Sequence, residues 1–453
     1  MNNSNKPSRS RRKFISDSTR AAAGIGLSGM ISAPLISTAR NRIIGANEMI
    51  RVGLIGARGM GFGDLSNAMK QPDAECIALC DIDDEILARR TADVIEQQGD
   101  AKKPANYKDY RKMLEDKDLD AVIIGTPDHW HCLPFIEACQ AGKDVYVEKP
   151  LANSIGECDL MVRTARKYNR VAQVGQQQRS GPHWQEAMEI MRKGGIGKLR
   201  KVLVWANFAY GVGASIVPDS EVPQGVDYEQ WLGPAPYRPF NKSRFHGHWR
   251  HCWDYGGGLM TDWGVHLLDM ALWVKDIKEP PVSVTASGGN FSHPDHFHET
   301  FDTMSVVFQM KDYSVSWEHT AGIQQGPYNR LYGLAYIGNE ATLVIDRQGY
   351  EVLPEYGNDG RPKIQPIPRV EGRRNHHAEH MRNFLDCMKT RKDPNCTVEN
   401  GKLVAMYAHM ANISLRTQST LTWDVTKRNF GKNKMANRLI TPDYRAPWEL
   451  PKI

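Results

Sequence analysis

Two short segments carry residue types suited to acid–base chemistry on a hydroxyl group. Lys149, which follows Glu148, can hydrogen-bond a substrate hydroxyl and lower the pKa of its proton. Asp262, His266 and Asp269 stand at i, i+4 and i+7, which predicts that they share one face of a helix. A carboxylate one turn from a histidine can orient its ring and raise its basicity. The alternative is structural: Asp262 as a helix cap and His266 as a packed ring.

A glycine-rich turn follows the first expected strand, in the segment Gly56-Ala57-Arg58-Gly59-Met60-Gly61. Such a turn lets the backbone approach a pyrophosphate at a helix N-terminus. The match to G-x-G-x-x-G is imperfect, because Arg58 stands where the second glycine belongs. Asp81 comes 20 residues after Gly61, where a carboxylate can bind both ribose hydroxyls of NAD. The pattern favours NAD, while Arg58, which could meet a phosphate, leaves NADP open.

The elements that must position these residues fall into two groups. Residues 50–172 alternate short apolar strands with helices, which is typical of a doubly wound parallel sheet. From about residue 200, longer alternating segments and helices near 260–274 and 377–389 indicate an α+β region with a large, mainly antiparallel sheet. We therefore expect an α/β chain with a dinucleotide-binding domain over 47–172. A domain for substrate binding and oligomerisation would follow over 173–453.

The basic excess of the chain is concentrated at its N-terminus. Residues 1–46 carry eight lysines and arginines and one aspartate, whereas the whole chain of 453 residues has a net charge of +6. Residues 47–453 are thus close to neutral, which gives no support for a nucleic-acid or membrane-surface partner. Arg11 and Arg12 precede a weakly apolar run over 21–36 and small residues at 37–39, the order of a twin-arginine export signal. A basic tail on a cytosolic protein is the alternative.

Membrane spans, disulfides and metals are not expected. The mean hydropathy is −0.52, and no run approaches the roughly 20 apolar residues that a membrane span requires. The eight cysteines contain no Cys-x-x-Cys pair, which favours buried free thiols. His376 with His380, and the polar group at 295–299, each lack a further ligand at a known spacing, so we expect no metal site.

Together, three segments resemble the Gfo/Idh/MocA oxidoreductase family, in particular its branch with a twin-arginine leader. They are Thr-Pro-x-x-x-His at 126–131, Glu-Lys-Pro at 148–150, and Gly-Gly-Gly-x-x-x-Asp-x-Gly-x-His at 256–266, and the resemblance covers roughly residues 50–430. It implies a Rossmann NAD-binding domain, with Lys149 as the active-site lysine, His266 as the general base and Asp262 as its companion carboxylate. The implied cofactor contacts are Gly56, Ala57, Arg58, Gly59, Met60, Gly61, Asp81, Thr126, Pro127, His129, His131, Glu148, Lys149 and Gln176.

The substrate implied by this resemblance is a sugar, a glycoside or a cyclic polyol. Its ring hydroxyl would exchange a hydride with nicotinamide while His266 takes the hydroxyl proton and Lys149 polarises the oxygen. Side chains that could line its site, or instead pack beneath the sheet, are Trp184, Trp249, Arg250, Trp253, Asp254, Tyr255 and Asp269.

Two other functions remain open. One is a hydrolase or lyase that oxidises a glycoside transiently with bound NAD and then eliminates the aglycone. The other is a non-catalytic NAD- or sugar-binding protein. We further expect a periplasmic homo-oligomer, dimer or tetramer, that holds its cofactor tightly.

Overall fold

A computed structural model of the protein describes Gly45, residues 48–372 and residues 376–453. The leader predicted over 1–46 lies outside the described residues, apart from Gly45. Within the described ranges, no helix is both long and apolar enough to cross a membrane.

The N-terminal half contains a six-stranded parallel sheet with strand order β3-β2-β1-β4-β5-β6. Its strands are β1 (Ile50–Ile55), β2 (Ala74–Cys80), β3 (Ala105–Tyr107), β4 (Ala121–Ile124), β5 (Asp144–Val147) and β6 (Ala172–Val174). The predicted doubly wound sheet is confirmed, and β6 carries it two residues beyond 172. The strand order reverses between β1 and β4, so the carboxyl ends of these strands open onto the crevice where such sheets bind ligands.

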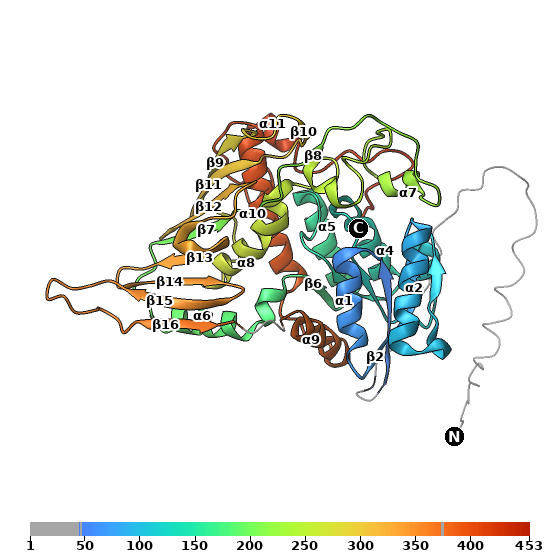
Figure 1. Ribbon diagram of the computed structural model, residues 1–453, viewed down its shortest axis with the longest axis horizontal. Coiled ribbons are helices and arrows are strands. Elements are labelled where there is room, and N and C mark those ends of the chain that lie inside the picture. The colour runs from blue at the N-terminus through green and yellow to red at the C-terminus, as the bar shows by residue number, and fades with distance from the viewer. Residues whose placement is uncertain (1–44, 46–47, 373–375) are drawn as a thin grey trace, which may run out of the picture. The chain divides into compact units, whose positions relative to one another are not determined.

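Helices cover both faces of this sheet (Figure 1). They are α1 (Gly59–Met69), α2 (Asp84–Gln98), α3 (Tyr110–Leu114), α4 (Cys132–Gln140) and α5 (Ile155–Lys167), with the 3₁₀ turns η1 (Asp100–Lys102) and η2 (Asp128–Trp130). The pattern places the first helix at 64–70, but α1 begins at Gly59, inside the glycine turn. Glycine has a low helix propensity, so the first turn of α1 could not be predicted from its residue types. Asp83 caps α2, and its side chain accepts hydrogen bonds from the Glu85 and Ile86 amides.

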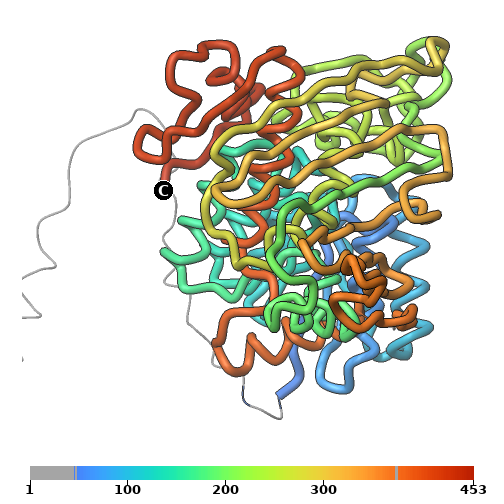
Figure 2. Tube along the Cα trace, turned by 90° about the vertical axis from the view of Figure 1, so that its left-hand side faces the viewer, coloured from blue at the N-terminus to red at the C-terminus, as the bar shows by residue number. Residues whose placement is uncertain are grey.

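The second sheet has eight strands in the order β16-β15-β14-β13-β7-β12-β11-β9. All neighbouring pairs are antiparallel except β7 with β12, which confirms the expected mainly antiparallel sheet. Figure 2 shows its strands running side by side. They are β7 (Lys201–Ala206), β9 (Ser283–Gly289), β11 (Thr303–Gln309), β12 (Ser314–Thr320), β13 (Tyr332–Ile337), β14 (Ala341–Asp346), β15 (Gly349–Pro354) and β16 (Ile367–Glu371). Strands β8 (Ala214–Ser215) and β10 (His296–Phe297) form a separate ladder.

The helices of the C-terminal half pack against this sheet and against the N-terminal half. They are α6 (Pro182–Arg192), α7 (Tyr228–Leu232), α8 (Val265–Trp273), α9 (His376–Thr390), α10 (Val398–Arg416) and α11 (Lys434–Asn437), with 3₁₀ turns η3 (Gln177–Ser180), η4 (His246–His251) and η6 (Pro327–Asn329). The helix expected over 260–274 is not uniform: η5 (Met260–Gly264) is a π-helical turn that leads into α8. Such turns are rare and are frequent at functional sites.

Helix α9 returns to the N-terminal half. Its side chains Met381, Phe384 and Leu385 are buried in the same core as Ile50 and Leu54 of β1. The chain after α11 also runs back over this half, where the Trp448 ring lies edge-on to the Trp130 ring at 5.0 Å between centroids. All eight cysteines are buried and free, as predicted.

Candidate active site

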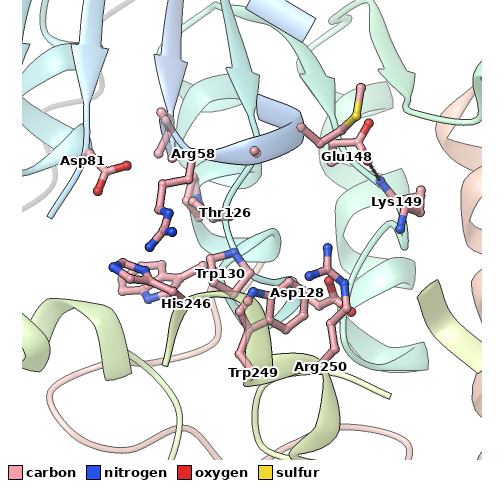
Figure 3. Close-up of a pocket in the computed structure, with 18 of the residues that line it drawn as sticks. Arg58, Asp81, Thr126, Asp128, Trp130, Glu148, Lys149, His246, Trp249 and Arg250 are labelled. Carbon is pink, nitrogen blue, oxygen red and sulfur yellow. Dashed lines mark hydrogen bonds between the residues drawn. The ribbon is translucent and has the colours of Figure 1, made fainter. Parts of the chain in front are cut away.

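A cavity of about 640 Å³ lies where the carboxyl ends of β1, β4 and β5 meet η5, α8 and the loops of the C-terminal half. Figure 3 shows its two ends, with Arg58, Asp81 and His246 on one side and Glu148, Lys149 and Arg250 on the other. The predicted residues that line it are Gly56, Arg58, Gly59, Met60, Asp81, Thr126, Pro127, Glu148, Lys149, Trp249, Arg250, Asp262 and His266.

The glycine turn builds the first end of the cavity from backbone. Gly56 has φ +85°, and a Cβ there would lie 2.8 Å from the Thr126 amide nitrogen. A Cβ at Gly61 would lie 2.4 Å from the Gly56 carbonyl oxygen, so both positions require glycine. Within the described chain no side chain caps the N-terminus of α1, and its first N–H groups stay available to an anion.

Asp81 lies beside this turn at the end of β2. Its Oδ2 accepts a hydrogen bond from the Ala57 amide at 2.7 Å, and its Oδ1 accepts one from the Asp83 amide at 3.1 Å. Burial raises the pKa of Asp81, while these amide bonds oppose the shift. In addition, Thr126 Oγ1 is buried without a hydrogen-bond partner among the described residues. A glycine cradle, an open helix terminus and a carboxylate at this spacing fit a dinucleotide.

The second end is organised around the carboxylate of Asp262. Lys149 Nζ lies 2.5 Å from Asp262 Oδ1, and Arg250 Nε lies 3.3 Å from the same oxygen. Tyr210 donates its hydroxyl proton to Asp262 Oδ2 at 3.2 Å. Burial alone would raise the pKa of Asp262, but the charges of Lys149 and Arg250 hold it below its usual value. The ammonium group of Lys149 is thereby fixed at the cavity wall.

His266 lines the same end from α8. Burial, followed by the charges of Arg347 and Lys149, lowers its pKa well below the usual value, so the ring is neutral near pH 7. Its Nδ1 is buried and has no hydrogen-bond partner in the described part of the chain. A neutral imidazole in this place can accept a proton.

The expected helix-face relationship among the three acid–base residues is corrected. No hydrogen bond joins Asp262 to His266 within the described residues, because Asp262 belongs to the π-helical turn and pairs with Lys149 instead. Asp269 lies outside the cavity, where its two oxygens accept bonds from Arg179 Nε and Nη2, both at 2.7 Å.

Glu148 closes the wall between the two ends. Its Oε1 accepts a bond from Gln177 Nε2 at 2.8 Å, and its Oε2 accepts one from the Lys149 amide at 3.3 Å. Burial raises the pKa of Glu148, and burial together with the neighbouring Glu148 raises that of Asp64 in α1. These contacts link α1 to the Lys149 backbone.

Several residues predicted to contact a cofactor support the cavity from behind instead of lining it. His131 places Nδ1 2.7 Å from the Pro150 carbonyl and Nε2 3.0 Å from the Thr126 carbonyl. His129 Nε2 lies 3.1 Å from the Trp231 carbonyl. Both rings are buried and contact carbonyl groups of neighbouring loops. Their position in the Thr126–His131 segment did not predict this structural role. Three further residues predicted to contact a cofactor do not line the cavity: Ala57, Gly61 and Gln176.

Of the predicted substrate residues, Trp249 and Arg250 line the cavity, whereas the others are used in packing. Trp184 and Tyr255 are fully buried in separate apolar clusters. Trp253 lies under the Arg416 guanidinium at 4.6 Å, and Asp254 accepts a bond from Arg238 Nε at 2.7 Å. Aromatic type alone therefore did not separate cavity residues from core residues.

Other lining residues are not among the predicted site residues. They are Ile55, Cys80, Ile82, Lys108, Asp109, Tyr110, Gly125, Asp128, Trp130, Pro134, Gln177, Tyr210, Gln230, Trp231, His246, Gly247, Trp263, Arg347 and His377. Asp128 and Trp130 fall inside the Thr126–His131 segment, and Gln177 is next to Gln176, so proximity was the signal that could have found them. The residues from distant loops carry no motif. No three His, Cys, Asp or Glu side chains of the described ranges are grouped to hold a metal ion.

Two family models match the chain. The model for the oxidoreductase family with an NAD-binding Rossmann fold (Gfo/Idh/MocA) matches residues 50–176, and the model for the C-terminal α/β domain of the same family matches 198–309 and 363–450.

Curated relatives resemble only part of the chain. A glycosyl hydrolase family 109 protein from Shewanella sp. (strain ANA-3) is 31% identical over 156 residues, which are 34% of this chain and 34% of the relative. An alpha-N-acetylgalactosaminidase from Shewanella oneidensis is 30% identical over the same length and the same shares. The chain therefore matches about a third of the length of these relatives.

Solved structures with low sequence identity share the fold over most of the chain. The aldose-aldose oxidoreductase from Caulobacter crescentus is 19% identical, with a TM-score of 0.63 over 83% of this chain and 100% of that chain. A levoglucosan dehydrogenase in complex with NADH and levoglucosan is 18% identical, with a TM-score of 0.63 over 83% and 99%. The solved structures agree with this chain in fold, and the two family models show the family. The chain belongs to the Gfo/Idh/MocA oxidoreductase family, and residues 50–176 are that family's NAD-binding Rossmann domain.

Proposed function

We propose that the protein is an NAD-dependent oxidoreductase that acts on a ring hydroxyl of a sugar, a glycoside or a cyclic polyol. The observation that carries this proposal is the Lys149–Asp262 ion pair at 2.5 Å, with His266 lining the same cavity as the glycine turn. An immobilised ammonium group and a neutral imidazole are what proton removal from a hydroxyl requires. Solved structures of this fold include proteins named as sugar oxidoreductases.

The residues that would hold NAD are Gly56, Gly59, Asp81, Thr126 and Glu148, all at the cavity wall. NAD, when bound, supplies the group that accepts or donates a hydride. The N-terminus of α1 would bind the pyrophosphate, and the carboxylate of Asp81 would accept bonds from ribose hydroxyls. The same carboxylate would repel the 2′-phosphate of NADP, which favours NAD.

The chain's own residues then handle the proton. Lys149, positioned by Asp262, donates a hydrogen bond to the substrate oxygen and stabilises the negative charge that develops there. His266 is neutral near pH 7 and accepts the hydroxyl proton. The Lys149 side chain is 10% exposed and His266 is buried, so little of either group faces bulk water.

The test is a panel of sugars, glycosides and polyols incubated with purified protein and NAD, followed by absorbance of the reduced nicotinamide and mass analysis of products. We expect Lys149→Met to lower turnover by at least about 100-fold. Lys198→Met, at an exposed lysine outside the cavity, is the matched control and should retain full turnover. Unchanged turnover in Lys149→Met would refute the proposal, and silence across the panel would favour a non-catalytic binding protein.

A second candidate function is NAD-assisted cleavage of a glycoside through transient oxidation and elimination. What favours it is the likeness to relatives named as glycosyl hydrolase family 109 proteins and as an alpha-N-acetylgalactosaminidase. Both candidate functions use Lys149 and His266. Release of a chromogenic aglycone without net reduction of NAD would favour cleavage, whereas stoichiometric reduction without aglycone release would favour the dehydrogenase.

The place of action is proposed as the periplasm, reached by the twin-arginine route. Support comes from Arg11 and Arg12 in front of a weakly apolar run and small residues. Replacing both arginines by lysine should retain the protein in the cytoplasm, as measured by cell fractionation, and secretion of that variant would contradict export by this route.

Because free NAD is scarce outside the cytoplasm, the cofactor should remain bound, and denaturing the purified protein should release nicotinamide in stoichiometric amount. An empty, easily washed site would refute tight binding.

Assembly into a homo-oligomer of two or four subunits is also proposed. Val307 of β11 and Leu353 of β15 are apolar and 50% and 40% exposed. They lie on the face of the eight-stranded sheet where Leu203 and Ile337 pack against the buried cluster of Trp205, Ala335 and Val344. An apolar sheet face of this kind is suited to association with a second copy. Light scattering coupled to gel filtration measures the subunit number, and a monomer at micromolar concentration would contradict the proposal.

A further inference from the structure

Arg347 lines the cavity, and the proposed reaction assigns it no contact with substrate or cofactor. It follows β14 directly, and its guanidinium carbon lies 4.5 Å from the centroid of the Trp263 ring. The His266 ring lies 5.8 Å from the same indole, centroid to centroid. The guanidinium group and the proposed base therefore both contact the Trp263 side chain and line one cavity.

The guanidinium group of Arg347 has few partners. In the part of the chain that the structure describes, no carboxylate oxygen is recorded within 4.0 Å of it, and its Nε is buried without an acceptor. Within the described residues, its side chain donates one long hydrogen bond, from Nη2 to Gln178 Oε1 at 3.5 Å. An arginine fork that is partly withdrawn from water normally satisfies its donors with a planar anion.

Neighbouring arginines show the contrast. Arg250, at the same end of the cavity, is paired with Asp262 at 3.3 Å. Arg179, just behind the wall, forms a two-pronged pair with Asp269. The fold thus supplies carboxylates to these two arginines and leaves the Arg347 fork facing the cavity.

His377 adds a second polar group beside this fork. It lines the cavity, and its Nδ1 is buried with no partner among the described residues. Burial, and then the charge of Arg347, lowers the pKa of His377 to about 4. The ring is neutral near pH 7, so the positive charge at this position belongs to Arg347.

We infer that Arg347 binds a carboxylate of the substrate, so that the sugar acted on is a uronic acid or a glycoside of one. The inference rests on the proposed function only in calling the bound sugar a substrate. The anion site itself is assigned from the contacts of Arg347. A carboxylate on the sugar ring would accept both prongs of the fork while a ring hydroxyl points to Lys149 and His266. This contact would make Arg347 a residue that determines specificity.

Calorimetric titration of the full chain, in the presence of NAD, tests the inference with matched sugar pairs. The pairs are glucuronate with glucose, galacturonate with galactose, and mannuronate with mannose. We expect at least one acid to bind about tenfold or more tightly than its neutral partner, because charge-assisted two-pronged bonds are strong. The preference should fall as salt is raised.

Variants at Arg347 assign that preference to its side chain. Arg347→Met should abolish the preference, because it should weaken binding of the acid by a much larger factor than binding of the neutral sugar. Arg347→Lys, which keeps the charge and loses the fork, should show an intermediate preference. Arg361→Met, at an exposed arginine of the same half, is the matched control and should behave as wild type. Thermal melting curves of all variants report on folding.

Each outcome decides the inference separately from the proposed function. If no acid is preferred, or if the preference survives in Arg347→Met, the inference is wrong even when neutral sugars are oxidised. If acids bind with a preference that depends on Arg347 but no sugar is oxidised, the anion site stands and the proposed function fails.

Discussion

Lys149 at the end of β5 and Asp262 in the π-helical turn η5 form an ion pair of 2.5 Å between residues 113 positions apart in the chain. The pair joins the parallel-sheet half to the antiparallel-sheet half at the cavity. Arg250 approaches the same carboxylate oxygen at 3.3 Å. One buried carboxylate therefore balances two cations, and its removal should affect both folding and turnover.

Asp262→Asn should leave Lys149 and Arg250 without a counter-charge. We expect turnover to fall by about 100-fold or more, since the ammonium group loses its positioning contact. The free energy of unfolding should fall by about 3–5 kcal/mol, as is usual when one partner of a buried pair is removed. Turnover is measured in the sugar panel and stability by denaturant unfolding. Asp254→Asn, which removes a carboxylate outside the cavity, should keep its turnover, and a fully active Asp262→Asn enzyme would contradict the role assigned to the pair.

The pH profile should report on His266. Burial and the charges of Arg347 and Lys149 lower its pKa, so the neutral base persists below pH 6.5. We therefore expect kcat/KM to decline only as the pH falls well below 6.5. Arg347→Met removes a positive charge near the ring, which raises the pKa of His266 and should move this decline to higher pH. An acid limb above pH 6.5 in the wild type, or one that Arg347→Met shifts to lower pH, would disagree with this assignment.

Asp81→Ser should relax the choice of cofactor. The carboxylate that repels a 2′-phosphate is removed, and its bond to the Ala57 amide is weakened. We expect the ratio of kcat/KM for NADP to that for NAD to rise by about tenfold or more, since each 1.4 kcal/mol changes an affinity tenfold. Asp118→Ser, at an exposed carboxylate that pairs with Arg51, is the control. A ratio that stays constant in Asp81→Ser would mean that another group sets the preference.

Buried histidines should make the fold sensitive to acid. Burial lowers the pKa to about 4 in each of His129, His131, His319, His380 and His409. The unfolded chain, with pKa values near 6.5, binds protons that the folded chain does not, so stability is full above pH 6.5 and falls as the pH drops toward 4. Each such proton adds about 1.4 kcal/mol per pH unit to the slope.

The measurement is the free energy of unfolding in denaturant at pH 7, 5.5 and 4.5. His319→Gln removes one of these titrating groups from a site far from the cavity, where its ring bonds to Trp317 and to the Phe301 carbonyl. The free energy of unfolding of His319→Gln should fall less per pH unit than that of the wild type. Stability that rises between pH 6.5 and 4.5 would show that the histidines do not control this range.

Short sequence motifs predicted those site residues that lie within a single strand end and the turn after it. The glycine turn, Asp81 and Lys149 each lie at a strand end, and alternation of strands and helices was enough to bring these ends to one edge. The π-helical turn was not predicted, because its residues read as an ordinary helix start. Pairing of Asp262 with Lys149 instead of His266 follows from that turn.

What the sequence could not reveal depends on contacts between distant segments. Arg347 and Tyr210 reach the cavity because the eight-stranded sheet packs at its mouth, and neither sits in a recognisable motif. Helix α10 escaped prediction because it is buried over most of its length and lacks a polar stripe. Trp184 was predicted to line the substrate site because it is aromatic. Its side chain is instead fully buried in the core.

The return of α9 to the first sheet has a consequence for biosynthesis. Met381 and Phe384 cover an apolar face shared with β1, yet they leave the ribosome after the whole eight-stranded sheet. While the nascent chain grows, helices α1 and α2 cover part of this core, and the part that α9 will cover stays exposed and prone to aggregation. The dinucleotide-binding half is therefore synthesised early, but its core is completed only when α9 has been made.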